Sequence, residues 1–407
     1  MTTQLVYITL AAFALTLAAI YLVSPIANKV GLVDKPCERK RHNGEIPLTG
    51  GIAIFLGVVC TTLFVSKMPT PYHGIFAAVI LLLILGIADD YRNLPAKYRL
   101  IIQFAAGLII ALGSKITLQS FGNLFSFGEI SLGIFAVPVT AFCIVGVINA
   151  TNMIDGIDGL AGGLSAITLA TLGYLSISSG SAYSQLILAT LGAVCGFLTL
   201  NARSPIRKHA KIFMGDSGSM VLGCIIAAML ISMSQGPHRA IRPVTALWVF
   251  AIPLMDTIGL IIRRLTKGQS PLSAGRDHIH HILQQKGLGV QQTVSTLTAC
   301  ALCLAAIGVL GEKYKVSEGI MFLSFATIFA LYLGFIVHSS RLSNEARNEH
   351  ANNEIPVTIQ LSPLNELLKL EQHSQEQAQF VELLEELDSL DDKGIAAPSE
   401  KRPAITP

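Results

Sequence analysis

Carboxylates gather in three short polar segments that interrupt long apolar runs. Asp89-Asp90 ends one run, residues 149–159 separate two others, and Gly215-Asp216-Ser217-Gly218 opens a further run. Ionisable groups within or beside membrane-spanning segments are costly and mark functional sites. Magnesium usually binds one or two carboxylates together with substrate phosphates. The three segments therefore predict a site for Mg²⁺ or Mn²⁺ and a phosphorylated substrate.

The second segment has the most informative spacing. Asn149, Asn152 and Asp155 follow one another at intervals of three, so one helical face can present all three side chains. Asp158 would turn away from this face if the helix continued, but the neighbouring glycines permit a break that brings it back. Polar side chains this dense between two apolar runs indicate a functional site.

Simpler readings remain open for the other two segments and for one isolated acid. Asp89-Asp90 could be a solvated helix end, although adjacent carboxylates there oppose the helix macrodipole. Asp216, flanked by glycine and serine, could be a helix N-cap. Asp256 lies inside an apolar run after Pro253, and the sequence leaves open whether it lines the site or pairs internally.

A fourth polar segment carries the opposite charge. Arg276, His278, His280 and His281 lie within six residues of one another. Three histidines could bind zinc, but no cysteine accompanies them and hard oxygen ligands dominate the other segments. Imidazole and guanidinium groups that donate to phosphate oxygens fit better. We therefore expect these four residues to bind an anionic substrate.

The elements that must position these residues are membrane helices. The chain has 407 residues, of which 52% are hydrophobic and 14% charged, against about 25% charge in soluble domains. Its mean hydropathy of +0.58 excludes an ordinary soluble enzyme and a disordered protein. Apolar runs long enough to cross a bilayer predict an all-α polytopic integral membrane protein with about eleven transmembrane helices. The expected spans are 4–23, 50–66, 72–88, 100–117, 130–148, 160–178, 184–200, 217–233, 244–262, 294–311 and 318–337.

Basic residues predict the orientation of these spans. One set of alternate loops carries 17 Lys and Arg, the other carries 6, and the richer set is expected in the cytoplasm. The N-terminus is then external, the C-terminus is cytoplasmic, and all four polar segments face the cytoplasm. We expect a membrane-embedded domain over 1–340 and an acidic cytoplasmic tail over 341–407. Leucines at helical spacing within 361–390 predict an amphipathic segment that packs on itself, on a second copy or on a partner protein.

The chain resembles the polyprenyl-phosphate N-acetylhexosamine-1-phosphate transferases over roughly residues 1–340. Its histidine segment resembles the branch that starts O-antigen, common-antigen and teichoic acid chains. The matching segments are Asp34-x-Pro36-x-x-Arg39-Lys40-x-His42, Pro47 with Gly50-Gly51, Asp89-Asp90, Asn149–Gly159, Gly215-Asp216-x-Gly218-Ser219 and His278-Ile279-His280-His281.

This resemblance implies an activity and roles for individual residues. An N-acetylhexosamine 1-phosphate, most often from UDP-N-acetylglucosamine, would pass to undecaprenyl phosphate at the cytoplasmic face of the bacterial inner membrane, with release of UMP. The other implied partners are membrane lipids, and no nucleic acid is implied. Asp216 and Asn152 would bind the metal, and Asp89, Asp90, Asp155 and Asp158 would be the catalytic carboxylates. The implied substrate-binding residues are Arg99, Asn149, Arg276, His278, His280, His281, Arg39 and Lys40.

Two other functions remain open at this point. A polytopic transporter would also carry acids in its spans, but transporters concentrate polar groups near the bilayer midplane, and here they gather at one face. A transferase of the same family could use another UDP-N-acetylhexosamine.

Overall fold

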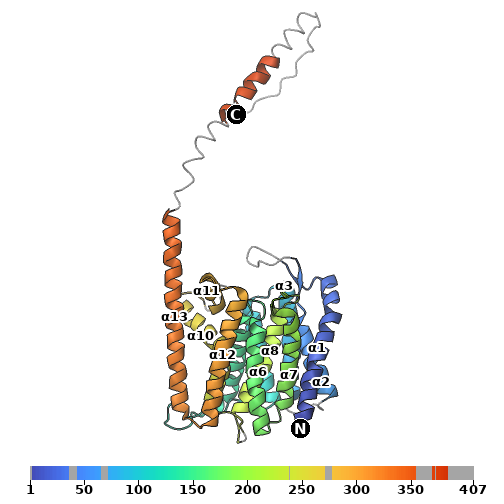
Figure 1. Ribbon diagram of the computed structural model, residues 1–407, viewed down its shortest axis with the longest axis vertical. Helices are drawn as coiled ribbons and strands as arrows, with labels where there is room; N and C mark the ends of the chain where they lie inside the picture. The colour runs from blue at the N-terminus through green and yellow to red at the C-terminus, as the bar shows by residue number, and fades with distance from the viewer. Residues whose placement is uncertain are drawn as a thin grey trace, which may run out of the picture. The chain divides into compact units, whose positions relative to one another are not determined.

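The computed structural model describes residues 2–35, 44–65, 72–237, 239–270, 277–353, 369–371 and 373–383 (Figure 1). The chain separates by its contacts into two units, Met1–Ser340 and Arg341–Pro407. Helices make up almost all of the first unit, and a two-residue antiparallel pair of strands joins its first two helices. The elements are α1 (Thr2–Val30), β1 (Val33–Asp34), β2 (Ile46–Pro47), α2 (Gly50–Phe64), α3 (Tyr72–Arg92), α4 (Ala96–Gly113), η1 (Gly133–Phe135), α5 (Ala136–Ile154), α6 (Leu160–Ser179), α7 (Ser184–Asn201), α8 (Gly215–Ser234), α9 (Pro243–Val249), α10 (Ala251–Thr266), α11 (Ile279–Gln285), α12 (Val290–Lys313) and α13 (Glu318–Asn353).

The expected all-α polytopic membrane fold is confirmed. Among the described residues, nine helices are long and apolar enough to cross a membrane. They are α1, α3, α4, α5, α6, α7, α8, α12 and α13, which correspond to nine of the eleven expected spans.

The two remaining spans differ from the prediction. α2 replaces the span expected at 50–66, but it has only 15 residues, fewer than the roughly 20 that a straight spanning helix needs. The span expected at 244–262 is not one helix. It is broken at Phe250 into α9 and α10, whose axes differ by 87°. Phe250 leaves helical geometry, and Pro253 lies in the first turn of α10, where proline is tolerated.

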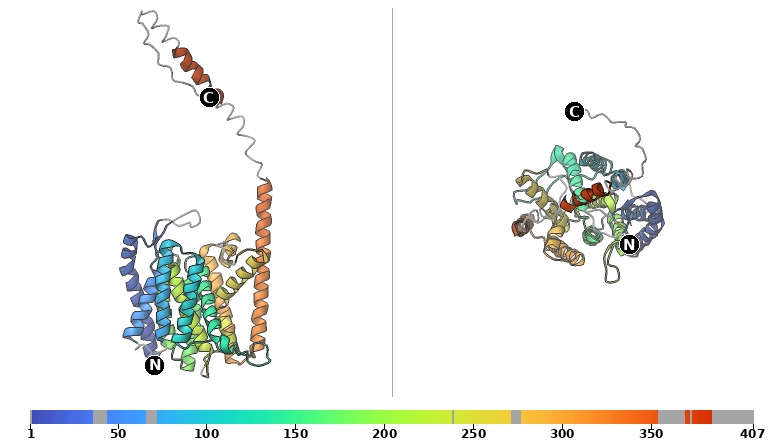
Figure 2. Two further views of the ribbon diagram at one scale, coloured as in Figure 1. Left: turned by 180° about the vertical axis from the view of Figure 1, so that it is seen from behind. Right: turned by 90° about the horizontal axis from the view of Figure 1, so that it is seen from above.

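The polar segments collect at one end of the helix bundle. Figures 1 and 2 show α1 beginning at the opposite end, and α11 lying beside the ends of the long helices at the site end. α8 is the central helix: almost all of its residues are buried, and it packs against α2, α3, α5 and α6. The start of α8 is therefore surrounded by other helices at the end where the carboxylates lie.

Glycines allow three helix backbones to meet at this end. A Cβ atom on Gly51 of α2 would lie 2.2 Å from the backbone nitrogen of Gly218 in α8, and one on Gly86 of α3 would lie 2.2 Å from the Cα of Ser217. Real side chains do not tolerate such distances, so any larger residue would force the helices apart. The first turn of α8 is consequently packed directly against the backbones of α2 and α3.

The second unit contains the end of α13 and a further helical stretch. Residues 373–383 are helical, with exposed side chains, and His373 Nδ1 lies 3.6 Å from Glu376 Oε2. This stretch lies within the amphipathic segment expected at 361–390, whose remaining residues fall mostly outside the described ranges. The role of the tail in association stays a prediction.

Candidate active site

The carboxylate of Asp90 caps the start of α8. Its Oδ1 accepts the backbone N–H of Asp216 at 2.7 Å, and its Oδ2 accepts that of Ser217 at 3.3 Å. The first N–H groups of a helix have no partner within the helix, so an anion is stabilised there. Gly215, with φ of +71°, leaves room for this contact, since a Cβ atom on it would lie 2.7 Å from Asp90 Oδ2. Asp90 thus joins the end of α3 to the start of α8.

Asp89 takes different partners from its neighbour. Its Oδ2 accepts a hydrogen bond from Arg99 Nη1 at 2.6 Å, and its Oδ1 accepts the backbone N–H of Leu94 at 2.7 Å. Asp89 is 2% exposed, and its partner Arg99 lies in the first turn of α4. A buried carboxylate needs such a partner. The ion pair with Asp89 holds the Arg99 guanidinium in place.

Asp216 lies between this guanidinium and the amide of Asn152. Asn152 Nδ2 donates to Asp216 Oδ1 and to Ser219 Oγ, the latter at 2.8 Å. Arg99 Nη1 is 4.0 Å from Asp216 Oδ2. Four elements, α3, α4, α5 and α8, therefore bring Asp89, Asp90, Arg99, Asn152 and Asp216 into one connected cluster.

Asn149 lies one turn before Asn152 but makes separate contacts. Its Nδ2 donates to Gln103 Oε1 in α4 at 2.7 Å and to the carbonyl of Val145 at 2.8 Å. Asn149 therefore links α5 to α4 beside the cluster. Its predicted contact with substrate stays a prediction.

Asp155 follows directly after the last residue of α5. Burial, together with the negative charges of Asp216, Asp90 and Asp158, raises the pKa of its carboxyl to about 7. The group therefore exchanges a proton near neutral pH. A shift that combines burial with the charges of nearby carboxylates is typical of functional sites.

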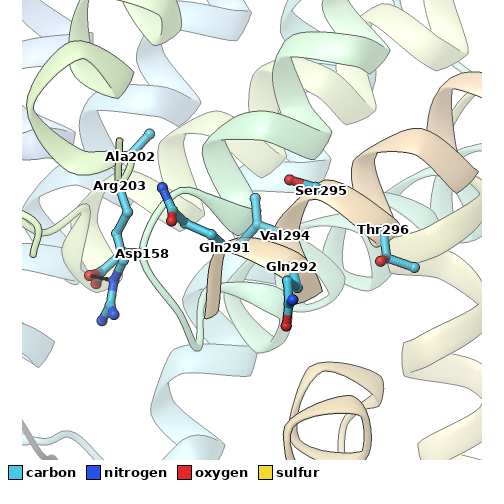
Figure 3. Close-up of a pocket in the computed structure, with 8 residues that line it drawn as sticks. All are labelled: Asp158, Ala202, Arg203, Gln291, Gln292, Val294, Ser295 and Thr296. Carbon is cyan, nitrogen blue, oxygen red and sulfur yellow. Dashed lines mark hydrogen bonds and ion pairs between the residues drawn. The ribbon is translucent and has the colours of Figure 1, made fainter. Parts of the chain in front are cut away.

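Asp158 lines a pocket of about 490 Å³ (Figure 3). Its Oδ2 accepts hydrogen bonds from Arg203 Nε at 2.7 Å and from the backbone N–H of Ala210 at 3.3 Å. Arg203 and the preceding Ala202 follow the end of α7, while the opposite wall comes from the first turns of α12 and includes Gln291 and Ser295. The pocket thus offers one ion pair and several neutral polar groups to a bound molecule.

The histidine segment reaches the same end of the bundle from α10 and α11. His280 is 1% exposed, and among the described residues neither of its ring nitrogens has a hydrogen-bond partner. A Cβ atom on Gly156 would lie 2.2 Å from His280 Nε2, so the imidazole lies against the turn that follows Asp155. Burial lowers the pKa of His280 to about 3, and the nearby His281 also lowers it. A buried polar ring without a partner is costly unless a ligand satisfies it.

His278 is held differently from His280. Its Nδ1 lies 2.7 Å from Asp256 Oδ2. The ring of His280 stacks on that of His278 with centroids 5.7 Å apart, and the ring of His281 lies 4.2 Å from that of His280. The three imidazoles therefore form one group. Arg39, Lys40 and Arg276, which were also expected to bind substrate, lie outside the described residues.

The side-chain oxygens of the cluster are the candidate ligands for a divalent cation. Within the described part of the chain, His, Cys, Asp and Glu side chains do not form a group of three or more that could hold a metal ion. Both oxygens of Asp89 and both oxygens of Asp90 already accept hydrogen bonds. Asp216 Oδ1 also accepts a hydrogen bond, from Asn152 Nδ2, so Asp216 Oδ2 and the side-chain oxygen of Asn152 remain as hard oxygen ligands. This set fits magnesium, which takes few protein ligands and completes its coordination with water and substrate phosphates.

Sequence reasoning left out several residues of the site. Arg203 and Gln103 were not singled out, because their partners Asp158 and Asn149 lie 45 and 46 residues away in the chain. Tyr332 of α13 donates its O–H to Asp256 Oδ1 at 2.9 Å. A lone tyrosine in an apolar span gives no signal of this contact.

Comparison with known proteins identifies the family of the chain. A sequence model described as Glycosyl transferase family 4 matches residues 72–234, which include Asp89 through Asp216. The undecaprenyl-phosphate alpha-N-acetylglucosaminyl 1-phosphate transferase of Yersinia pestis is 39% identical over 335 residues, 82% of this chain and 90% of that protein. The chain belongs to glycosyl transferase family 4. Proteins with the same name from Escherichia coli K12 and Haemophilus influenzae are each 39% identical, over 79% and 80% of this chain and 88% and 92% of their own lengths.

Membership of glycosyl transferase family 4 makes the chain a multi-pass membrane glycosyl-1-phosphate transferase. The transporter interpretation is therefore set aside. The expected family was correct, and the matched region ends with α8, so the histidine segment lies beyond it.

Proposed function

We propose that this protein transfers N-acetylglucosamine 1-phosphate from UDP-N-acetylglucosamine to undecaprenyl phosphate and releases UMP. The observation that carries the proposal is the cluster at the start of α8, where Arg99 and Asn152 flank Asp216. It brings a guanidinium and hard oxygen ligands into one small volume, as diphosphate chemistry requires. The names of the relatives support the acceptor and the sugar.

In the proposed reaction, a phosphate oxygen of the lipid acceptor attacks the sugar-bearing phosphorus of the donor. The bond between that phosphorus and the bridging oxygen breaks, and the bridging oxygen leaves with UMP. The acceptor phosphate is already a competent nucleophile, so the site does not need a strong base. In this proposal Arg99, which is held by Asp89, would neutralise the diphosphate, and the buried His280 would contact its oxygens.

Asp216 and Asn152 would hold the divalent cation in this reaction. When bound, the ion would neutralise charge on the transferring phosphates. Asp90 then has a separate task, because its oxygens keep the first turn of α8, and with it Asp216, in place. Asp155 and Asp158 would lie toward the nucleotide, where the pocket beside Asp158 has room for it.

The location of the site suits its two substrates. A long-chain lipid phosphate must be met within the bilayer, and a nucleotide sugar arrives from water. Polar groups at one end of a membrane bundle are accessible to both. We infer that this end faces the cytoplasm of a bacterial inner membrane, because the richer set of basic loops belongs to it, and that the product starts a cell-surface polysaccharide.

The proposal is tested with purified protein in detergent, undecaprenyl phosphate and Mg²⁺ or Mn²⁺. UMP release is measured with UDP-N-acetylglucosamine and, in parallel, with other UDP-N-acetylhexosamines. Release that requires both the acceptor and UDP-N-acetylglucosamine is the expected result. Faster turnover of another UDP-sugar would make the chain a transferase of the same family with a different donor. Absence of release with every donor would overturn the proposal.

A further inference from the structure

The buried carboxylate of Asp256 collects donors from two other elements. Asp256 lies in α10 and is 3% exposed. Its Oδ2 contacts His278 Nδ1 at 2.7 Å, and its Oδ1 accepts the backbone N–H of Ile279 at 2.9 Å and the O–H of Tyr332 at 2.9 Å. The sequence left open whether Asp256 pairs internally or lines the site. It does pair internally, and one of its partners is a histidine of the site.

The contact with Asp256 determines which ring nitrogen of His278 is available to a substrate. A carboxylate beside Nδ1 favours a proton on that nitrogen, so Nε2 is the nitrogen that remains for a substrate. The neighbouring N–H of Ile279, the first residue of α11, is held by the same carboxylate. One carboxylate therefore fixes both the tautomer of the ring and the backbone from which it projects.

A second contact between α10 and the histidine segment lies two turns further along the helix. Arg263, seven residues after Asp256, lies with Nη2 at 3.4 Å from Asp277 Oδ1, and its Nη1 donates to the Asp277 carbonyl at 3.3 Å. Asp256 and Arg263 thus share one face of α10 and hold adjacent residues of the segment.

α13 supports this arrangement from outside. Tyr332 packs against Gly259 of α10, where a Cβ atom would lie 3.3 Å from the tyrosine ring. One turn later, the ring of Phe335 lies under Lys286 Nζ at 4.6 Å, at the end of α11. Nearer its start α13 packs instead through Phe325 against Trp248 of α9, so Tyr332 and Phe335 mark the part of α13 that meets the histidine segment.

We propose that Tyr332 of α13 is a positioning residue, which acts through Asp256 to orient the imidazole of His278 toward the substrate diphosphate. The inference rests on the proposed function for the identity of that substrate. Loss of the tyrosine hydroxyl removes one of three donors to Asp256 and lets the carboxylate and the His278 ring rotate. Misplacement of a positioned group costs more in the transition state than in binding.

The test is a double-mutant cycle between Tyr332→Phe and His278→Gln. Tyr332→Phe is expected to lower kcat about tenfold, and to change KM for either substrate by less than about twofold. In the His278→Gln background the same substitution is expected to have little further effect, because the group it orients is gone. Tyr314→Phe is the matched control, since Tyr314 is exposed at the opposite end of α12, and it should behave as wild type.

A purely structural role would give a different result. It would lower the unfolding temperature and reduce turnover equally in both backgrounds. An undiminished effect of Tyr332→Phe in the His278→Gln background, or wild-type kcat in folded Tyr332→Phe, would overturn the inference. If Tyr332→Phe does not fold, Asp256→Asn takes its place in the same cycle and must show the same dependence on His278.

A second measurement separates this inference from the proposed function. Hydrogen exchange of the Ile279 amide, without substrate, is expected to accelerate in Tyr332→Phe and in Asp256→Asn but not in Tyr314→Phe. Wild-type protein that releases no UMP would count against the proposed function alone. Unchanged exchange at Ile279 in both variants would overturn the positioning role whatever the activity.

Discussion

Asp89 and Asp90 are adjacent in the chain, yet their carboxylates receive hydrogen bonds from different parts of the structure. Asp89 is paired with a guanidinium, whereas Asp90 is paired with backbone amides at the start of another helix. Successive residues on a helix point about 100° apart, so each carboxylate faces a different neighbour. One therefore serves the charge balance of the site, and the other serves its architecture.

Asp216 is the residue on which metal dependence is expected to rely. Asp216→Asn should lower turnover at limiting magnesium by at least about a hundredfold, because a bound cation contributes several kcal/mol of transition-state stabilisation. The helix start should survive, since the carboxylate that caps it belongs to Asp90. UMP release is measured against magnesium concentration, with Glu129→Gln as control because Glu129 is an exposed acid outside the cluster. Near-native rates at limiting magnesium would reduce Asp216 to a structural residue.

His280 is expected to make the stability of the protein fall at acidic pH. Its pKa of about 3 in the folded protein lies below the ordinary value of 6.5. The stability associated with the neutral His280 ring is therefore fully present above about pH 6.5, and it is lost as pH falls toward 3. At pH 5 the loss relative to neutral pH amounts to about 2 kcal/mol. His280→Gln should lose less stability between pH 7 and pH 5 than wild type, as followed by unfolding temperature in detergent.

The control for this measurement is His209→Gln, which removes an exposed histidine. It should retain the acid sensitivity of the wild type. Equal acid sensitivity in wild type and in His280→Gln would show that the buried ring is not its source.

Sequence reasoning found the carboxylates and histidines of the site but not their division of labour. Dense polar residues beside apolar runs are visible in sequence because each has a high desolvation cost. The partners are not visible, because Arg99 with Asp89 and Asn152 with Asp216 come from different helices whose contacts arise only on packing. Asp256 was noticed but not assigned, since its partner Tyr332 is 76 residues away and resembles any other tyrosine in a span.

At the level of elements, hydrophobicity located the nine long apolar helices of the described residues but misjudged two further spans. The break at Phe250 is not visible in the hydrophobicity of this window of apolar residues. Pro253 lies just after the break, in the first turn of α10, where proline is tolerated. After the break, α10 carries Asp256, Arg263 and Arg264 as buried side chains. These charges would be costly in a straight span facing lipid, and they are accommodated because α10 turns by 87° toward other protein elements.

The close contact between α3 and α8 gives a prediction at the same scale. Gly86→Ala would place a methyl group 2.2 Å from Ser217 Cα, and it should destabilise the protein by about 1–3 kcal/mol through overpacking. It should also displace Asp216 and reduce turnover. Unfolding temperature and UMP release are measured together.

Gly146→Ala is the matched control for this substitution. Gly146 lies in the middle of α5, and a Cβ atom there would meet nothing within 4 Å. Alanine is favoured over glycine within a helix by about 0.5–1 kcal/mol, so this variant should be as stable as wild type or more so. Equal tolerance of both substitutions would show that α3 and α8 do not meet as closely as described.

For the whole molecule, the unequal basic loops predict that residue 1 is external and residue 407 cytoplasmic. Single cysteines are introduced near each end of a variant that lacks the native cysteines. An impermeant thiol reagent applied to intact cells should label the N-terminal cysteine and leave the C-terminal one unlabelled until the cells are opened. Labelling of the tail in intact cells would reverse the orientation.

The tail is expected to be dispensable for catalysis, whereas α13 is not. Residues 339–407 carry 13 acidic and 6 basic side chains, and the proposed substrates are anions, so the tail should not attract them. Deletion of 345–407 should leave kcat and acceptor KM nearly unchanged and alter association or expression instead. Deletion from residue 330 onward removes Tyr332 and should lower turnover strongly. A hundredfold loss in the shorter deletion, in protein that is still folded, would place the tail in the active site.

The carboxylate cluster and the histidine segment are held in place in different ways. Around Gly51, Gly86 and Gly218, helix backbones touch directly, whereas the histidine segment is held by single side chains such as Asp256 and Tyr332. Side-chain attachments of this kind open locally at a lower free energy than a buried helix bundle unfolds. Warming or an unsuitable detergent should therefore inactivate the protein while its helices remain intact. A full helical circular dichroism spectrum therefore does not show that a purified sample is active.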